Sequence, residues 1–353
     1  MYPDARRVPR GVPPKGENGA ANLFLRNGLV LWRLMRYFVT GGTGFIGGIL
    51  VRRLRSAGHE VSLVVREPSK AEALARIGAR VHKGDITDKD SMRGPMAGVD
   101  GVFHLAAWYK VGGRDKSPAV PINVGGTRNV LELMGELGIP KGVYTSTLAV
   151  FGDTKGQVVD ETYRHDGPWL SEYDRTKWIA HYEVAEPMIR KGLPLVIVQP
   201  GVTYGPGDPS IMGVTLREYL RRELRGVPKG AAYCWGHVED TAAAHVLGME
   251  RGRAGESYIV AGEPRTLVDV IEMAVRITGI AAPRLRPSPG FLRFLAAVTR
   301  SEVLRGSAGV TYLGSNAKAT RELGLHHRPL EEGLRETLLA EMRALGIPPR
   351  GNA

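Results

Sequence analysis

A glycine-rich turn between a predicted strand and a predicted helix constrains the fold more than any other feature of the chain. Residues 40–47 read T-G-G-T-G-F-I-G and directly follow the short β-like run at residues 37–39. Gly41, Gly44 and Gly47 let the backbone turn tightly, and they let main-chain N–H groups approach a pyrophosphate at the helix N-terminus, where the dipole favours negative charge. The stretch therefore predicts a dinucleotide-binding unit, with Phe45 and Ile46 as its first helical residues.

Apolar, β-branched runs alternate with helical patterns after this turn, which predicts a parallel sheet covered on both faces. The predicted strands lie at residues 60–66, 80–82, 99–105, 142–145, 195–199 and 258–260, and the predicted helices include residues 45–57, 125–137 and 170–190. The expected fold class is α/β, a Rossmann-type doubly wound parallel sheet with a smaller, interleaved C-terminal substrate domain. The expected boundaries are 35–200 for the dinucleotide-binding domain, 201–345 for the substrate domain, 237–261 for a return to the first domain and 346–353 for a tail.

Composition excludes several functional classes. The single cysteine, Cys234, excludes an internal disulfide and a cysteine-built zinc site, and it suits a reducing, cytoplasmic setting. The net charge is +12, yet the chain has no recognition-helix motif, zinc spacing or aromatic-basic stripe that predicts nucleic-acid binding. The charge fits a phosphorylated cofactor or simple solvation of arginines. His326 and His327 are adjacent without partners at metal-ligand spacing, so no metal site is expected.

The first 34 residues differ from the rest. Residues 1–19 are rich in proline and glycine and predict a loop or disorder. Residues 23–35 are apolar but short, and they include Arg26 and Arg33, so they predict neither a transmembrane segment nor a secretory signal. Two interpretations stay open: a spurious upstream extension of a domain that begins at Met35, or a surface amphipathic anchor.

Tyr173 and Lys177 are the first candidate catalytic residues. They are four residues apart in a predicted helix, so both side chains lie on one face. A lysine ammonium close to a phenol favours phenolate, which predicts a lowered pKa for Tyr173 and a proton donor usable near neutrality. A third candidate comes from the hydroxyl cluster of residues 145–147, which follows a predicted strand.

Arg66 bears on the choice of cofactor. In dinucleotide folds that prefer NAD, an acidic residue near the end of the second strand binds the ribose hydroxyls. Here that position holds Arg66, followed by Lys70, and a guanidinium suits a 2′-phosphate. NADP(H) is therefore the preferred cofactor, and NAD(H) stays possible because Glu67 can reach the ribose.

Together these features resemble the extended branch of the short-chain dehydrogenase/reductase superfamily, within it the dihydroflavonol-4-reductase-like and NAD-dependent epimerase/dehydratase proteins. The resemblance spans residues 36–345, and its residue runs are V-V-R-E-P at 64–68, G-D-I-T-D at 84–88, H-L-A-A at 104–107, Y-T-S-T-L-A-V-F-G at 144–152 and G-H-V-E-D at 236–240. It implies Thr147 as the catalytic hydroxyl, counted back from Phe151, with Ser146 as the alternative. It also implies a homodimer formed through the helices at 125–137 and 170–190.

The resemblance further implies cofactor contacts for a set of strand-end residues. Asp85 and Ile86 correspond to the pair that contacts adenine, and Lys177 is expected to bond the nicotinamide ribose. The remaining expected cofactor contacts are Leu105, Ala106, Ala107 and Pro200.

The predicted activity is NADPH-dependent reduction of an aldehyde or ketone by hydride transfer, with Tyr173 as proton donor. The first alternative is an NAD-dependent nucleotide-sugar epimerase or dehydratase. Sugar-nucleotide members typically carry an arginine four residues before the histidine at position 237, whereas this chain has Tyr233 there. The second alternative is a non-catalytic NADP(H)-sensing protein.

The substrate side supports three weaker interpretations. Arg217, Arg221 and Arg225 predict a basic stripe on a helix spanning residues 213–225, which is a solvated face or an anion-binding wall. A second pattern, formed by Phe291, Phe294, Leu295 and Val298, predicts a core or lid helix rather than a lipid-binding surface. Finally, aromatic residues suggest a pocket for an apolar or ring-bearing carbonyl compound: Trp108, Tyr109, Tyr204, Tyr233 and Trp235.

Overall fold

The chain divides into two compact units, Met1–Arg33 and Leu34–Ala353. The computed structural model describes residues 24–26, 29–31, 34–110, 112–113 and 115–348. In the first unit, β1 (Phe24–Arg26) pairs antiparallel with β2 (Leu29–Leu31). The other predictions for residues 1–34 lie almost entirely outside the described residues.

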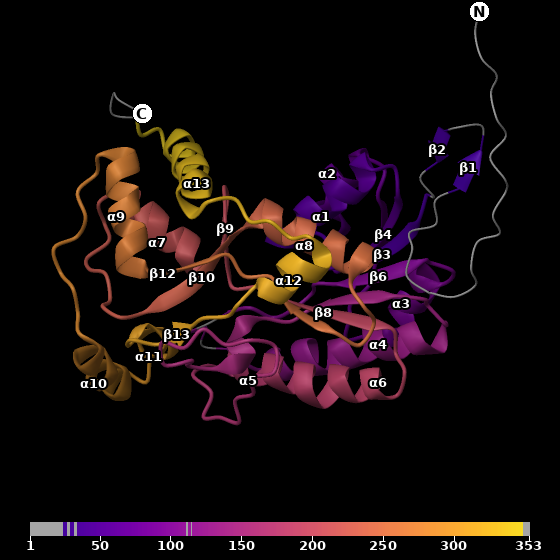
Figure 1. Ribbon diagram of the computed structural model, residues 1–353, viewed down its shortest axis with the longest axis horizontal. Helices are drawn as coiled ribbons and strands as arrows, with labels where there is room; N and C mark the ends of the chain where they lie inside the picture. The colour runs from indigo at the N-terminus through magenta and orange to yellow at the C-terminus, as the bar shows by residue number, and fades with distance from the viewer. Residues whose placement is uncertain (1–23, 27–28, 32–33, 111, 114, 349–353) are drawn as a thin grey trace, which may run out of the picture. The chain divides into compact units, whose positions relative to one another are not determined.

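A seven-stranded parallel sheet forms the centre of the second unit (Figure 1). Its strands, in spatial order, are β11 (Ser257–Ile259), β8 (Leu195–Gln199), β7 (Gly142–Thr145), β6 (Gly101–His104), β3 (Arg36–Thr40), β4 (Glu60–Val65) and β5 (Arg80–Lys83). The predicted Rossmann-type α/β fold is confirmed. The chain runs outward from β3 to β5 and then returns to β6 on the other side of β3, so the strand order reverses between β3 and β6. Ligands of doubly wound sheets bind at the carboxyl ends of the strands beside such a point.

Helices cover both faces of this sheet, because successive strand residues point to opposite sides and both sides are apolar. One face packs residues such as Val39, Phe103 and Val198 against α1 and α8, and the other packs Phe38, Val102 and Ile197 against α4 and its neighbours. The first face carries α1 (Phe45–Ser56), α8 (Val238–Arg251) and α12 (Ala317–Leu323), with η1 (Pro68–Ala71) and α2 (Glu72–Arg76) connecting β4 to β5.

The helices of the second face include two that contain a wider π-helical turn. These elements are α3 (Lys89–Met96), the π turn η2 (Pro121–Gly126) leading into α4 (Thr127–Glu136), α5 (Glu172–Ile179), the π turn η4 (Ala180–Ala185) and α6 (Glu186–Arg190). The short 3₁₀ turn η3 (Leu148–Phe151) follows β7 and packs in a separate apolar cluster with Cys234 and Ile259. The turn η4 lies just before Pro187, which has no N–H to continue an α-helical ladder.

A smaller mixed sheet and its helices form the C-terminal region. Strand β10 (Ala232–His237) lies at its centre and pairs with β9 (Val202–Tyr204), β12 (Glu263–Thr266) and β13 (Thr311–Tyr312). A second apolar core packs against β10, and it is built from α7 (Ile211–Leu220), α9 (Leu267–Thr278) and α13 (Leu330–Ala344). Two further helices, α10 (Pro289–Thr299) and α11 (Glu302–Ser307), precede β13. Among the described residues, no helix combines the length and apolarity needed to cross a membrane.

The predicted arginine stripe does not form. Helix α7 ends at Leu220 rather than at residue 225, because Arg222 adopts a positive φ of 62°, which a right-handed helix cannot contain. Arg217 turns inward, where its Nη1 donates to the Asp208 carbonyl at 2.9 Å and lies 3.5 Å from a Glu341 carboxylate oxygen. Arg225 lies beyond the end of α7, so the three arginines do not share one helix face.

Candidate active site

The glycine turn lies at the point where the strand order reverses. Gly41 has a φ of 71°, and a Cβ on it would lie 2.6 Å from the Ala106 backbone nitrogen. A Cβ on Gly47 would lie 2.1 Å from the Gly41 carbonyl oxygen. Only glycine fits at either position. The turn thus presses against Leu105 and Ala106 at the end of β6, and the two candidate cofactor segments form one surface.

The N-terminus of α1 is open to an anion. Gly44 is the N-cap residue, no side chain caps the helix, and the first turn contains no acidic residue. The N–H groups of the first turn, at Phe45, Ile46 and Gly47, have no partner within the helix and carry the positive end of its dipole. The Phe45 ring also lies against the loop after β9, since a Cβ on Gly205 would be 3.4 Å from Phe45 Cζ.

Arg66 and Asp85 lie together at the ends of β4 and β5. Arg66 Nε is 4.0 Å from Asp85 Oδ2, and 70% of the arginine side chain is exposed. The neighbouring Glu67 bonds Lys70 at 2.8 Å, and this contact lowers the pKa of Glu67. Ile86 is buried, and Asn129 holds its carbonyl oxygen at 2.9 Å. The Arg66 guanidinium is therefore exposed to solvent, while the carboxylate of the next residue, Glu67, is paired with Lys70.

Tyr173 and Thr147 approach each other from different elements. Tyr173 lies in the first turn of α5, which Ser171 caps, and Thr147 caps η3 after β7. The Thr147 hydroxyl faces the Tyr173 phenol, and this interaction acts to lower the pKa of Tyr173. Ser146 points elsewhere, since its hydroxyl and His181 Nδ1 are 2.7 Å apart in the interior. Of the two candidate hydroxyls, only Thr147 reaches the phenol.

The pKa of Tyr173 differs from the sequence prediction. Burial raises the pKa of this phenol above its ordinary value, and the nearby Tyr109 adds to the effect. The predicted lowering by Lys177 is absent because the lysine Nζ is bonded elsewhere, to the Tyr144 hydroxyl at 3.0 Å and the Thr145 carbonyl at 2.8 Å. Burial lowers the pKa of Lys177 itself to about 7. In this protein the phenol is thus a protonated group at neutral pH.

A buried polar chain connects Lys177 to the glycine turn, and the sequence did not predict it. Thr40 Oγ1 and His104 Nδ1 are 2.7 Å apart, and His104 Nε2 and Thr127 Oγ1 are 3.0 Å apart. Tyr144, the partner of Lys177, stacks on the His104 ring with a centroid distance of 5.5 Å. Burial lowers the pKa of His104 to about 3, so its ring is neutral. A polar histidine at the end of an otherwise apolar strand was the available signal.

A second missed group lies directly beside Tyr173. Asp174 is 4% exposed, and burial raises its pKa to about 6, although bonds from Ser171 and Tyr312 oppose the shift. Tyr312 Oη donates to Asp174 Oδ2 at 3.2 Å, and the Tyr312 ring stacks on Tyr233 with a centroid distance of 6.2 Å. Since these residues come from α5, β13 and β10, their meeting depends on the tertiary fold.

The predicted aromatic pocket is only partly formed. Tyr109 contacts Tyr173 edge to face at a centroid distance of 4.9 Å, and after burial it is the second cause of the raised pKa of Tyr233. Tyr204 and Trp235 instead lie in the buried core of the C-terminal region, and Trp108 is buried with its backbone bonded to Asn123. The wall beside the candidate catalytic phenol is therefore built from Tyr109, Tyr233 and Tyr312.

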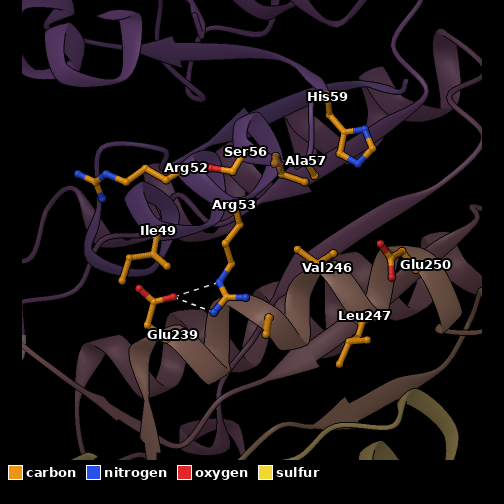
Figure 2. Close-up of a pocket in the computed structure, with 12 residues that line it drawn as sticks. Ile49, Arg52, Arg53, Ser56, Ala57, His59, Glu239, Val246, Leu247 and Glu250 are labelled. Carbon is orange, nitrogen blue, oxygen red and sulfur yellow. Dashed lines mark hydrogen bonds and ion pairs between the residues drawn. The ribbon is translucent and has the colours of Figure 1, made fainter. Parts of the chain in front are cut away.

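A separate surface cavity of about 540 Å³ lies between α1 and α8 (Figure 2). Its lining includes Ile49, Leu54 and Val246, and Arg53 reaches across it to Glu239 with nitrogen–oxygen distances of 3.1 and 2.8 Å. None of the candidate catalytic or cofactor residues belongs to this lining. The cavity is thus distinct from the site at the strand ends.

Comparison with known proteins agrees with this geometry. A family model described as "NAD dependent epimerase/dehydratase family" matches residues 37–261. A "Putative dihydroflavonol 4-reductase" of Synechocystis sp. is 33% identical over 86% of this chain and 93% of its own length. UDP-glucose 4-epimerase of Streptomyces lividans is 30% identical over 76% of this chain and 90% of its own length.

Solved structures show the same likeness. A UDP-glucose 4-epimerase from Thermotoga maritima, crystallised with UDP-glucose, superposes with a TM-score of 0.72 and 25% identity over 88% of this chain and all of its own. The relatives thus include both reductases and sugar epimerases.

Proposed function

Because this chain belongs to the NAD dependent epimerase/dehydratase family, we propose that it is an NADPH-dependent reductase of an aldehyde or ketone. Family membership makes it an NAD(P)-dependent enzyme of the oxidoreductase and epimerase type. The observation that carries the finer assignment is Arg66, which is 70% exposed at the end of β4 while Glu67 is held by Lys70. A guanidinium donates to a 2′-phosphate and offers no acceptor to a ribose hydroxyl.

The residues at the strand ends fit such a dinucleotide. The uncapped N-terminus of α1 supplies N–H donors for a pyrophosphate, and Gly41 and Gly47 leave no side chain in its way. Arg66 and Lys70 would hold the 2′-phosphate, Asp85 and Ile86 the adenine, and Leu105, Ala106, Ala107 and Pro200 the nicotinamide end. When bound, NADPH supplies the hydride.

Thr147 and Tyr173 would bind the carbonyl oxygen of the substrate. The Thr147 hydroxyl faces the Tyr173 phenol, so an oxygen that enters between them would meet two donors. As the carbonyl carbon gains the hydride, Tyr173 gives its proton to the oxygen, and the product is an alcohol. The raised pKa of Tyr173 keeps the phenol protonated before this step. Lys177, positioned by Tyr144 and Thr145, would bond the nicotinamide ribose.

The rival within the family is a nucleotide-sugar epimerase or dehydratase that reoxidises its own NAD cofactor in each turnover. The substrate wall argues against it, because the position typical of a diphosphate-binding arginine holds Tyr233, which is buried and stacked on Tyr312. A phenol has no cationic form, so Tyr233 offers no positive charge to a diphosphate.

Two measurements test the proposal. Titration by tryptophan fluorescence is expected to give NADPH binding at least about tenfold tighter than NADH, which corresponds to about 1.4 kcal/mol. Arg66→Ala should abolish this preference, whereas Arg80→Ala should not, since Arg80 pairs with Glu60 at the amino ends of β5 and β4, opposite to the end that carries Arg66. Equal NADH binding, or NAD that copurifies, would contradict NADPH dependence.

Turnover separates the three candidate functions. NADPH consumption with a panel of aldehydes and ketones, lost in Tyr173→Phe while cofactor binding persists, is the result expected of a reductase. Conversion of a sugar nucleotide without net cofactor consumption would instead identify the epimerase or dehydratase. Cofactor binding with no turnover of either substrate class would identify a non-catalytic sensor of NADP(H).

A further inference from the structure

Helix α10 carries its large apolar side chains on the outside, which contradicts the core helix that the sequence offered as one interpretation. Phe291, Phe294 and Val298 are 56%, 67% and 67% exposed, and their spacing places them on one face. The inward face uses Leu292 and Ala296, which are 4% exposed. The result is an exposed apolar stripe, here called the α10 stripe (Phe291, Phe294 and Val298).

The surroundings of the α10 stripe are strongly basic. Residues 281–310 contain five arginines and one acidic residue, Glu302. That glutamate is already paired with Lys116 at 2.5 Å, so it leaves the local excess of positive charge in place. Arg293 lies on α10, and Arg300 directly follows it; both are exposed. A short helix with a phenylalanine-rich face and flanking arginines has the composition of helices that lie in a membrane interface.

The helix is joined to the rim of the candidate active site. Helix α11 follows α10 after two residues, and Glu302 Oε1 accepts a hydrogen bond from the backbone nitrogen of Glu172, the residue before Tyr173, at 3.3 Å. Val303 packs on Gly112, where a Cβ would be 2.6 Å from Val303 Cγ2. Figure 1 shows α10 at the periphery of the C-terminal region, with α11 between it and α5.

We propose that α10 docks this protein onto an anionic lipid surface. The α10 stripe enters the boundary between headgroups and acyl chains, and Arg293 and Arg300 contact lipid phosphates. The helix has 11 residues, about half the length that spans a bilayer, so it lies in the plane of the membrane surface. A second copy of the chain is the less favourable occupant, because a two-fold contact would set one basic segment against the other.

Vesicle flotation of the full chain, without cofactor or substrate, tests the docking independently of the proposed reaction. Binding is expected to phosphatidylcholine vesicles that contain phosphatidylglycerol, with weaker binding to phosphatidylcholine alone and a decrease with added salt. Phe291→Ser combined with Phe294→Ser should weaken binding at least tenfold, while the melting temperature and NADPH binding stay unchanged. Arg293→Gln combined with Arg300→Gln should remove the preference for the anionic lipid.

Ile77→Ser is the matched control. Ile77 is also an exposed large apolar residue, 41% exposed, but it follows α2 in the dinucleotide-binding region, and its loss should leave vesicle binding unchanged. Absence of wild-type binding to either vesicle would overturn the proposal, as would equal binding by the phenylalanine double variant. Concentration-dependent dimerisation that the phenylalanine substitutions abolish, without vesicle binding, would assign the α10 stripe to a second copy instead.

Discussion

Burial makes the protonated form of Lys177 costly, and removing this lysine should change how the free energy of unfolding depends on pH. Burial lowers the pKa of Lys177 from its ordinary value of 10.5 to about 7. Multiplied by 1.36 kcal/mol per pKa unit, this difference corresponds to about 5 kcal/mol of destabilisation at pH values well below 7. The bonds from its Nζ to Tyr144 and Thr145 are part of the folded state to which that pKa belongs.

The sign of the effect follows from proton binding. Between pH 7 and 10.5 the unfolded chain keeps the lysine proton, while the folded protein has largely released it. Unfolding therefore takes up a proton, and the free energy of unfolding rises with pH in this window. From pH 7 to pH 9 the contribution of this one group amounts to about 2 kcal/mol.

We expect Lys177→Met to remove this pH-dependent rise. The free energy of unfolding would be measured by urea denaturation, followed by tryptophan fluorescence, at several pH values from 7 to 9. The orphaned Thr145 carbonyl costs the variant about 1–3 kcal/mol, but this cost does not depend on pH. All other titrating groups cancel in the difference between the two proteins. Lys191→Met, which removes an exposed lysine, controls for the change in net charge.

Parallel curves for the wild type and Lys177→Met, within about 0.5 kcal/mol from pH 7 to 9, would refute the reasoning, since that spread is ordinary for neutral substitutions. That result would mean that the ammonium is solvated or paired in the folded protein. A slope lost equally in Lys191→Met would assign the effect to net charge rather than to burial.

Three further predictions concern other residues of the candidate site. Asp174→Asn should stabilise the protein at pH 7.5 by up to about 3 kcal/mol, because the pKa of Asp174 is about 6 in the folded protein against an ordinary 3.8, so stability falls as the pH rises from about 3.8 to 6. Thermal melts should show that this gain shrinks to about half at pH 5. A gain that does not change with pH would contradict the prediction. Gly47→Ala should cost about 3 kcal/mol or more and abolish cofactor binding, since its Cβ would lie 2.1 Å from the Gly41 oxygen; calorimetry and cofactor titration check this, and an unchanged melting temperature would argue against it. Thr147→Val should lower kcat for carbonyl reduction about 100-fold, whereas Thr147→Ser should keep most of the wild-type kcat. If both variants keep the wild-type kcat, Thr147 has no part in the mechanism.

The sequence was sufficient to locate those strands and helices whose patterns involve only neighbouring residues. The predicted strand at residues 60–66 corresponds to β4 at Glu60–Val65, and the strand at 99–105 to β6 at Gly101–His104. The spacing of Tyr173 and Lys177 requires only that a helix forms there. By contrast, α7 ends where it does because Arg222 has a positive φ, and the spacing of arginines or apolar residues along the sequence does not reveal the backbone conformation of one residue.

Interactions between distant segments could not be predicted in this way. Tyr144 meets Lys177 across 33 residues, and Tyr312 meets Asp174 across 138, so both contacts exist only once the strand order is fixed. The same holds for the exposure of Phe291 and Phe294. An apolar helical pattern predicts a buried face, but which face finds a partner depends on what packs there.

The sequence by itself determined that this chain forms a dinucleotide-binding α/β fold and which residues are its candidate catalytic groups, because glycine spacing, strand alternation and an i, i+4 pair are properties of neighbouring residues. Only the tertiary structure decided how those groups are charged. Burial makes Tyr173 a weaker acid and Lys177 a weaker base. The cost of placing a charge in a low-dielectric interior depends on all the groups that surround it.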